Sequence, residues 1–184
     1  MGRGGRAIFE CCPADICRCP IGVSASRSGI AEPSGSAADV RWMSVAIEEA
    51  KAAGNRGEIP VGAVVVMDGG VVGRGGNASV SLNDPTAHAE VLALRAAGAA
   101  VGNYRLPRAT LYATVEPCPM CMGSMLHARV ARLVYGCPDP KGGAAGSVMD
   151  LGNNPCLNHR LTVTRGVLEA ECVALLRRFF AARR

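Results

Sequence analysis

The sequence lacks any long apolar run. No stretch of the 184-residue chain reaches the about 18 consecutive apolar residues that a membrane-spanning helix needs, so we expect no contact with a membrane. Residues 1–39 also lack the continuous apolar core of a secretory signal. A hydrophobic content of 49% is nevertheless enough for a core, and the length fits one ordinary domain with a tail.

Apolar periodicity is missing from residues 1–39, which are rich in Gly, Ser, Arg and Cys. We expect a disordered N-terminal extension over 1–39 and a folded domain over 40–184. Two alternatives stay open for the extension: a transit peptide, against which its four acidic residues argue, and a true start further downstream. Its cysteines match no metal-site spacing that we can defend, and incidental thiols are the simpler interpretation; they are Cys11, Cys12, Cys17 and Cys19.

Acidic residues are few in the last third of the chain. Residues 120–184 carry nine basic groups against four acidic ones, whereas the segments before them are balanced. The whole net charge of +5 therefore lies after residue 119. A one-sided basic surface is what a polyanionic partner such as nucleic acid would need, although a solvated surface with an Arg-rich end explains the same count.

Hydrophobic periodicity and turn residues predict strands that alternate with helices after an opening hairpin. The expected order predicts an α/β fold, a three-layer α/β/α sandwich around a mixed five-stranded sheet. The expected strands are 61–67, 71–76, 110–115, 130–135 and 161–164, and the expected helices include 40–53 and 119–127. A further helix opens at Asp84-Pro85 and carries on one stripe His88, Val91, Leu92 and Arg95. The last helix begins near Leu168, and its expected buried stripe is Leu168, Cys172, Leu175, Leu176 and Phe179.

Two short segments carry a recognisable chemical pattern. His88-Ala89-Glu90 spells H-x-E, and Pro117-Cys118-Pro119-Met120-Cys121 spells P-C-x-x-C, with Cys118 thirty positions after His88. One imidazole and two thiolates suit zinc, and three protein ligands leave the fourth tetrahedral position open, as in catalytic sites. Alone, His88 could be a core histidine, and P-C-x-x-C could be a structural zinc knuckle or a redox pair.

The local sequence places both segments at helix starts. Asp84 can cap a helix and Pro85 suits its first turn, while Cys118 precedes Pro119 in the same way. The free N–H groups of a helix start favour a thiolate at Cys118, and Cys121 lies one turn further along the same side. Zinc would lower the pKa of a bound water from about 15.7 to roughly 7. Glu90 could then move its proton, or it could be an ordinary solvated carboxylate.

The two segments together are typical of zinc-dependent nucleobase deaminases. From about Val40 to Arg184 the chain resembles the bacterial tRNA-specific adenosine deaminases of the cytidine deaminase-like superfamily. The segments that carry the resemblance are Trp42-Met43, 59–66, 103–106, Gly143-Ala144-Ala145-Gly146-Ser147, Asn158-His159-Arg160 and 171–180, and the last three favour the tRNA enzymes over cytidine or guanine deaminases.

The resemblance implies hydrolytic deamination of the wobble adenosine of a tRNA anticodon, chiefly of an arginine tRNA, to inosine. It also implies a homodimer that binds the anticodon arm, with one zinc in each subunit and Glu90 as the catalytic acid and base. By the same resemblance Asn77 contacts the flipped base, Asp139 lies in the loop that touches the target nucleotide, and Asn158 and Arg160 meet the anticodon. From the residues alone, Asn77 could equally cap a strand end, Asp139 could form a turn, and the other two could be surface groups.

The chain departs from the resemblance in one loop. Residues 136–142 read Gly-Cys-Pro-Asp-Pro-Lys-Gly, so two prolines stiffen the loop and the usual arginine is absent. Two other functions stay open: a deaminase of guanine or another free base or nucleoside, and a non-catalytic binding module stabilised by zinc. The odd total of nine cysteines, the thiolate ligands and the missing secretion signal indicate a reducing cytoplasm.

Overall fold

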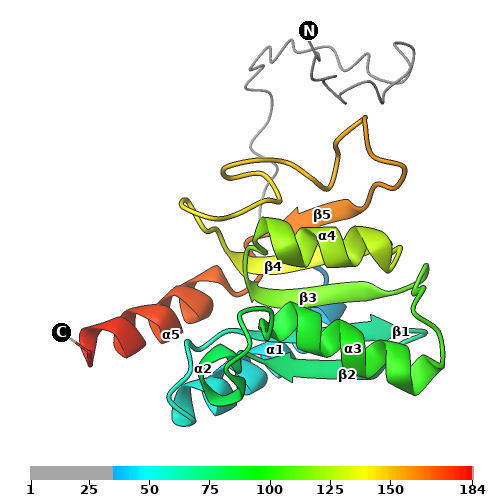
Figure 1. Cartoon of the computed structure of the whole chain (residues 1–184). Helices are drawn as coiled ribbons and strands as arrows, with labels where there is room; N and C mark the ends of the chain where they lie inside the picture. Colours follow the sequence, from blue (N-terminus) through cyan, green and yellow to red (C-terminus); the bar gives the residue numbers. More distant parts are fainter. Residues whose placement is uncertain (1–34, 184) are drawn as a thin grey trace, which may run out of the picture. The chain divides into compact units, whose positions relative to one another are not determined.

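The computed structural model describes residues 35–183 (Figure 1), so the predicted disorder of residues 1–34 lies outside the described part of the chain. In this part, none of the helices has the length and apolar character needed to cross a bilayer. The elements in chain order are α1 (Ala37–Asn55), β1 (Gly62–Met67), β2 (Gly70–Gly76), α2 (Ser79–Leu82), α3 (Ala89–Val101), β3 (Thr110–Val115), α4 (Pro119–His127), β4 (Arg132–Cys137), β5 (Thr162–Arg165) and α5 (Glu169–Ala181).

The five strands form one mixed sheet in the order β2-β1-β3-β4-β5. β1 pairs antiparallel with β2 and with β3, whereas β3, β4 and β5 run parallel to one another. The parallel strands are joined by α4 and by the long segment 138–161, because a parallel pair needs a crossover connection. The predicted hairpin and the predicted mixed sheet are confirmed.

Helices cover both faces of the sheet. Along β1, Ala63 and Val65 pack with α3 and α4, while Val64 and Val66 pack with α1 and α5. Side chains that alternate between two apolar layers explain why the central strands are continuous apolar runs without a polar face. The resulting α/β/α sandwich confirms the predicted fold class, with α3 and α4 together on one side of the sheet (Figure 1).

Glycines in β2 let α3 lie close to the sheet. A Cβ atom at Gly75 would lie 2.3 Å from the carbonyl oxygen of Ala89, and one at Gly73 would lie 2.2 Å from that of Ala93. A larger residue at either position would therefore push away the start of α3. Since His88 and Glu90 flank Ala89, the two glycines fix the height of the H-x-E segment above the sheet.

The first helix begins earlier than the sequence predicted. Ser36 accepts from the backbone N–H of Asp39 and the Asp39 carboxylate accepts from that of Ser36, which is a capping box. The helix therefore begins at Ala37 and not near 40, and residues 36–39 belong to the folded part rather than to the extension. The periodicity missed this start because it is determined by polar groups and not by an apolar stripe.

The prediction for the start of α3 was wrong. Asp84 accepts from the N–H and hydroxyl of Thr86, so Asp84-Pro85 forms a turn, and α3 begins at Ala89. The predicted stripe also differs, because Leu92 is only partly buried and Arg95 is exposed. The residues of α3 that are buried are Ala89, Glu90, Val91, Ala93, Leu94 and Ala97.

Two smaller differences concern the strand ends and a short helix. β4 covers Arg132–Cys137, two residues later than predicted, and α2 was not predicted at all. In α5 the buried residues are Cys172 and Leu175, and the other three positions of the predicted stripe are only partly buried. Leu176 and Phe180 of α5 line the cavity that is described below.

Candidate active site

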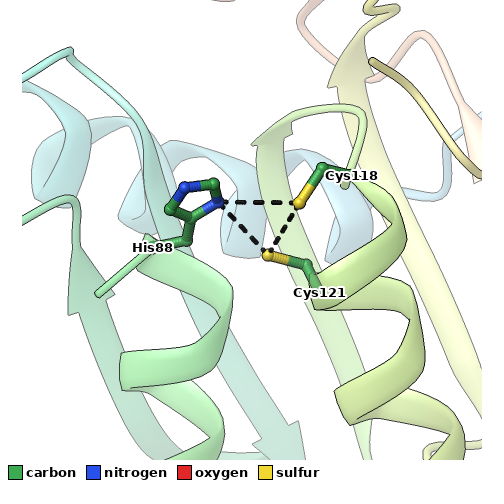
Figure 2. A group of neighbouring side chains, drawn as sticks. All are labelled: His88, Cys118 and Cys121. Atoms are coloured by element: carbon green, nitrogen blue, oxygen red, sulfur yellow. Dashed lines mark hydrogen bonds between the residues drawn. The ribbon is translucent and has the colours of Figure 1, made fainter. Parts of the chain in front are cut away.

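Three ligand atoms meet between the starts of α3 and α4 (Figure 2). Nδ1 of His88 lies 3.7 Å from Sγ of Cys118 and 3.5 Å from Sγ of Cys121, and the two sulfur atoms are 3.6 Å apart. A tetrahedral zinc ion with its usual bond lengths requires about 3.8 Å between two sulfurs and about 3.5 Å between sulfur and nitrogen. The three side chains therefore fit zinc without rearrangement, and they are the three that could hold a metal ion in residues 35–183.

The helix starts explain this convergence. His88 is the N-cap residue of α3 and Cys118 is the N-cap residue of α4, with Pro119 directly after it, and neither side chain caps its own helix. Both side chains are therefore free to point into the space between the two helices. Cys121 lies one turn inside α4 and faces the same space (Figure 2). The prediction that both motif halves lie at helix starts is confirmed.

The contact between the two sulfur atoms shifts the pKa values of the two cysteines in opposite directions. The hydrogen bond from Cys121 lowers the pKa of Cys118 to about 4, and the same bond raises the pKa of Cys121. The hydrogen bond to Cys118 also raises the pKa of His88, against the effect of its burial. A divalent cation held by these groups would favour the thiolate form of both cysteines, since bound thiols are deprotonated by the metal.

Glu90 lies two residues after His88 and its side chain is buried, with 4% of its surface exposed. Burial raises the pKa of its carboxyl above the ordinary range, although the neighbouring His88 acts in the opposite direction. A carboxyl group with a raised pKa can both accept and return a proton near neutral pH. The solvated surface carboxylate that the sequence also allowed is therefore not what the structure contains.

A cavity of about 740 Å³ opens in front of these groups. This volume lies in the range of sites for small organic ligands, about 300–1,000 Å³. Apolar side chains form most of its wall, and polar groups gather at its inner end beside His88 and Glu90. The apolar lining residues are Ile59, Val61, Val80, Pro85, Val115, Pro138, Pro140, Leu176 and Phe180.

Two of the four predicted substrate contacts line this cavity and two do not. Asn77 is buried at the end of β2, and Asp139 is partly buried in the loop after β4. Asp139 also accepts from the N–H of Lys141, so it has the turn role as well. Asn158 and Arg160 are exposed on the segment before β5, away from the cavity, and Asn158 accepts two hydrogen bonds from Arg129.

Two buried carboxylates of the site were missed by the sequence analysis. Glu116 accepts hydrogen bonds from the N–H groups of Asp139, Ala145 and Ser147 and from the Ser147 hydroxyl. A Cβ atom at Gly143 would lie 2.3 Å from the Glu116 carboxyl carbon, so the loop can close around Glu116 only with glycine there. The position of Glu116 directly before Pro117-Cys118 was the available signal.

The second missed carboxylate, Glu58, has 1% of its surface exposed and lies between α1 and β1. It accepts hydrogen bonds from the amide of Asn77 and from the N–H groups of Val80 and Ser81. Hydrogen bonds lower the pKa of Glu58, although burial alone would raise it. Nothing in the sequence marks Glu58, because its partners lie 19 to 23 residues away.

Comparison with known proteins agrees with this geometry. Residues 36–137 match the cytidine and deoxycytidylate deaminase zinc-binding region. The tRNA-specific adenosine deaminase of Agrobacterium fabrum is 47% identical over 143 residues, which cover 78% of this chain and 94% of that protein.

Two solved structures are similar as well. One, from studies of A-to-I editing by tRNA deaminases at the wobble position of transfer RNA, is 46% identical, with a TM-score of 0.72 and coverage of 74% of this chain and 99% of that one. A guanine deaminase from Nitrosomonas europaea is 26% identical, with a TM-score of 0.68 and coverage of 82% and 88%. The chain therefore belongs to the cytidine and deoxycytidylate deaminase zinc-binding family, and within it to the tRNA-specific adenosine deaminases.

Proposed function

We propose that this protein is a zinc-dependent hydrolase that converts the wobble adenosine of a tRNA anticodon to inosine and releases ammonia. The observation that carries the proposal is the convergence of one imidazole nitrogen and two sulfurs within 3.7 Å of one another, beside a buried carboxyl. The near full-length similarity to tRNA-specific adenosine deaminases supports adenosine as the base.

The residues of the chain have separate roles in this reaction. Zinc held by His88, Cys118 and Cys121 supplies a Lewis acid that lowers the pKa of a water beside it. Glu90 takes a proton from the attacking water, delivers it to N1 of the adenine ring and then helps to protonate the departing ammonia. Its burial next to His88 places the Glu90 carboxyl where it can hold the proton between the two transfers.

The shape of the cavity suits a base that has left its stack. The apolar wall replaces the contacts that the base loses, and Asn77 offers an amide to its edge. An anticodon loop is already single-stranded, so extruding one base from it costs less than from a duplex. Asp139, held by Glu116, would touch the target nucleotide at the mouth of the cavity.

We infer further that an arginine tRNA is the substrate, that Asn158 and Arg160 meet its anticodon, and that the protein is a cytoplasmic homodimer. The support is the resemblance of the segments at 143–147, 158–160 and 171–180 to the tRNA enzymes. Because Asn158 and Arg160 do not line the cavity, the contacts proposed for them are with nucleotides next to the target. Light scattering of the purified protein would test the dimer, and a monomer at micromolar concentration would contradict it.

The direct test incubates the zinc-loaded protein with an anticodon stem-loop that carries adenosine at the wobble position. We expect stoichiometric conversion of this adenosine to inosine, and no conversion when the wobble base is replaced by guanosine. Stem-loops of several tRNAs compared in the same assay would test the arginine preference. Absence of inosine from every stem-loop would overturn the proposed function.

Guanine deamination is the second candidate, because the N. europaea guanine deaminase shares the fold over most of both chains. A parallel incubation with free guanine would reveal it through xanthine formation. Salt separates the two functions, since binding of a polyanionic tRNA weakens steeply as salt rises, whereas binding of a neutral base does not.

A further inference from the structure

Glu58 lines the same cavity as Glu116 and holds a different part of its wall. One of its oxygens, Oε2, accepts from Nδ2 of Asn77 at 3.3 Å and from the N–H of Val80 at 3.3 Å. The other, Oε1, accepts from the N–H of Ser81 at 2.7 Å. A single carboxylate thus holds both the residue expected to read the base and the segment that follows it.

The contact with Glu58 determines how the Asn77 amide is oriented. An ionised carboxylate can only accept hydrogen bonds, so the group that faces it must be the NH₂ of Asn77 and not its oxygen. The backbone N–H of Asn77 is bonded to the carbonyl of Val61 at 2.9 Å, which holds the main chain as well. The amide oxygen and the second N–H of Asn77 therefore remain available to a ligand in the cavity, and the orientation of the amide is fixed.

The same carboxylate caps α2. The N-cap residue of this short helix is Ala78, which has no side chain able to accept from the free N–H groups of the first turn. Glu58 accepts from two of these groups, at Val80 and Ser81, in place of a local cap. Because Ser79 and Val80 line the cavity, the position of this part of the wall depends on Glu58.

We propose that Glu58 is a positioning residue for substrate recognition, which acts by fixing the Asn77 amide and the first turn of α2 against the bound nucleotide. This inference rests on the proposed function, since it takes Asn77 as the residue that contacts the base. Glu58 lies between α1 and β1 and bonds to Asn77, Val80 and Ser81, with no hydrogen bond to the zinc ligands or Glu90, so we expect it to affect substrate binding rather than the chemical step.

The test is a double-mutant cycle with Glu58→Gln and Asn77→Ala, assayed on the anticodon stem-loop. Glutamine keeps the size of the side chain but replaces one acceptor oxygen with an NH₂, which faces either Asn77 and Val80 or Ser81, so one donor faces another. We expect KM for the stem-loop to rise on the order of tenfold, the consequence of one lost hydrogen bond, with a much smaller change in kcat. In the Asn77→Ala background the same substitution should raise KM by a smaller factor, because only its effect on the first turn of α2 remains.

The matched control is Glu49→Gln, the same change at a carboxylate of α1 that pairs with Arg74 and does not line the cavity. It should leave KM and kcat unchanged. Glu58→Asp keeps the negative charge and should recover part of the lost affinity, whereas a role in packing alone would make the shorter side chain worse than glutamine.

The outcomes separate the two proposals. If the wild-type protein forms inosine and Glu58→Gln raises KM equally with Asn77 or Ala at position 77, the inference fails and the proposed function stands. If the wild-type protein forms no inosine, both fail. Should Glu58→Gln not fold, Asn77→Asp tests the same contact. It would place a second carboxylate against Glu58, and the repulsion between the two ionised groups would make KM rise as pH increases from 5 to 8. An Asn77→Asp protein with a KM independent of pH would contradict the contact.

Discussion

Two buried polar clusters lie on opposite faces of the sheet and differ in how their hydrogen bonds are satisfied. The first joins Asp39 of α1 to Arg132, through contacts of 2.8 and 3.0 Å, and to the Tyr112 hydroxyl at 3.0 Å. The second contains His88, Cys118 and Cys121 with Glu90 beside them. We refer to them as the Asp39 cluster and the zinc site.

In the Asp39 cluster the protein supplies every partner. Burial raises the pKa of Asp39, but hydrogen bonds from Arg132, Ser36 and Tyr112 outweigh it and lower the pKa to about 2. Burial and the bond to Asp39 raise the pKa of Tyr112 to about 12. In the zinc site, by contrast, burial outweighs the neighbouring charge of His88 and raises the pKa of Glu90.

The comparison separates a structural role from a catalytic one. A buried group whose partners are all in the chain has its charge state fixed, so it can stabilise the fold but cannot exchange protons near neutral pH. A buried polar group that lacks such partners lowers the stability of the fold unless an ion or a substrate supplies the missing interaction. Burial alone would not have distinguished the two carboxyls, whereas the direction of the pKa shift does: hydrogen bonds outweigh burial at Asp39, and burial outweighs the other effects at Glu90.

The largest effect is expected at the zinc ligands. Cys121→Ala should abolish metal binding and inosine formation, because two remaining ligands hold zinc too weakly. The matched control is Cys137→Ala, which removes another buried free thiol, at the end of β4. It should keep one zinc per chain and its activity. Metal analysis and the stem-loop assay measure both, and a Cys121→Ala protein that retained zinc would contradict the assignment.

Glu90→Gln should have the next largest effect. We expect kcat to fall about 10²- to 10⁴-fold, the usual contribution of a positioned acid and base, while zinc content stays unchanged. Thermal unfolding should occur at the same or a higher temperature, since an uncharged amide is cheaper to bury than a carboxyl whose pKa is raised. Ammonia release at the wild-type rate would rule out Glu90 as the group that moves the proton.

Much of the fold could be predicted because its signals are local. β3 and α4 begin and end where the sequence predicted, since Thr110 to Val115 is rich in β-branched and aromatic residues and Pro119 suits a helix start. The zinc ligands were also predictable, because their spacing within each motif is set by a single helix turn or helix start.

The remaining features depend on contacts distant in sequence. Asp84-Pro85 has the composition of a helix start, yet Asp84 bonds to Thr86 and the helix begins only at Ala89. The close packing of Ala89 against Gly75 determines where the helix lies along the sheet. Glu58 and Glu116 have no local pattern, because their roles arise only when loops 23 and 31 residues away close around them. Secondary-structure propensity and hydrophobic periodicity do not predict polar contacts between residues distant in sequence.

The Asp39 cluster predicts a stability effect without a catalytic one. Because the folded-state pKa of Asp39, about 2, lies below its ordinary value of 3.8, its stabilisation is present above pH 4 and is lost as pH falls toward 2. This amounts to about 2 kcal/mol of unfolding free energy. Asp39→Asn should remove that pH dependence and destabilise the protein at pH 7 by about 3 kcal/mol, because Arg132 loses its buried partner.

Denaturant unfolding at pH 7 and at pH 3 measures this change, and kcat/KM at pH 7 should stay within twofold of the wild-type value. Asp68→Asn is the control, since Asp68 pairs with Arg108 at the surface, where both side chains are more than half exposed. An exposed pair contributes about 0–1 kcal/mol. Equal destabilisation by the two substitutions would show that burial of the Asp39 cluster does not matter.

The smallest effect tests the same contrast on two neighbouring hydroxyls of α2. Within residues 35–183, the Ser79 hydroxyl is the one buried side-chain oxygen or nitrogen without a hydrogen-bond partner. Ser79 also lines the cavity. The Ser81 hydroxyl, by contrast, donates a hydrogen bond to the carbonyl of Ala78. Ser81→Ala should therefore lower the unfolding free energy by about 1 kcal/mol, and Ser79→Ala should leave it unchanged or raise it. If the substrate forms the missing hydrogen bond with the Ser79 hydroxyl, as an ion would bind the three ligands of the zinc site, Ser79→Ala should raise KM about two- to tenfold. A Ser79→Ala protein with reduced stability and an unchanged KM would place this hydroxyl with the structural groups.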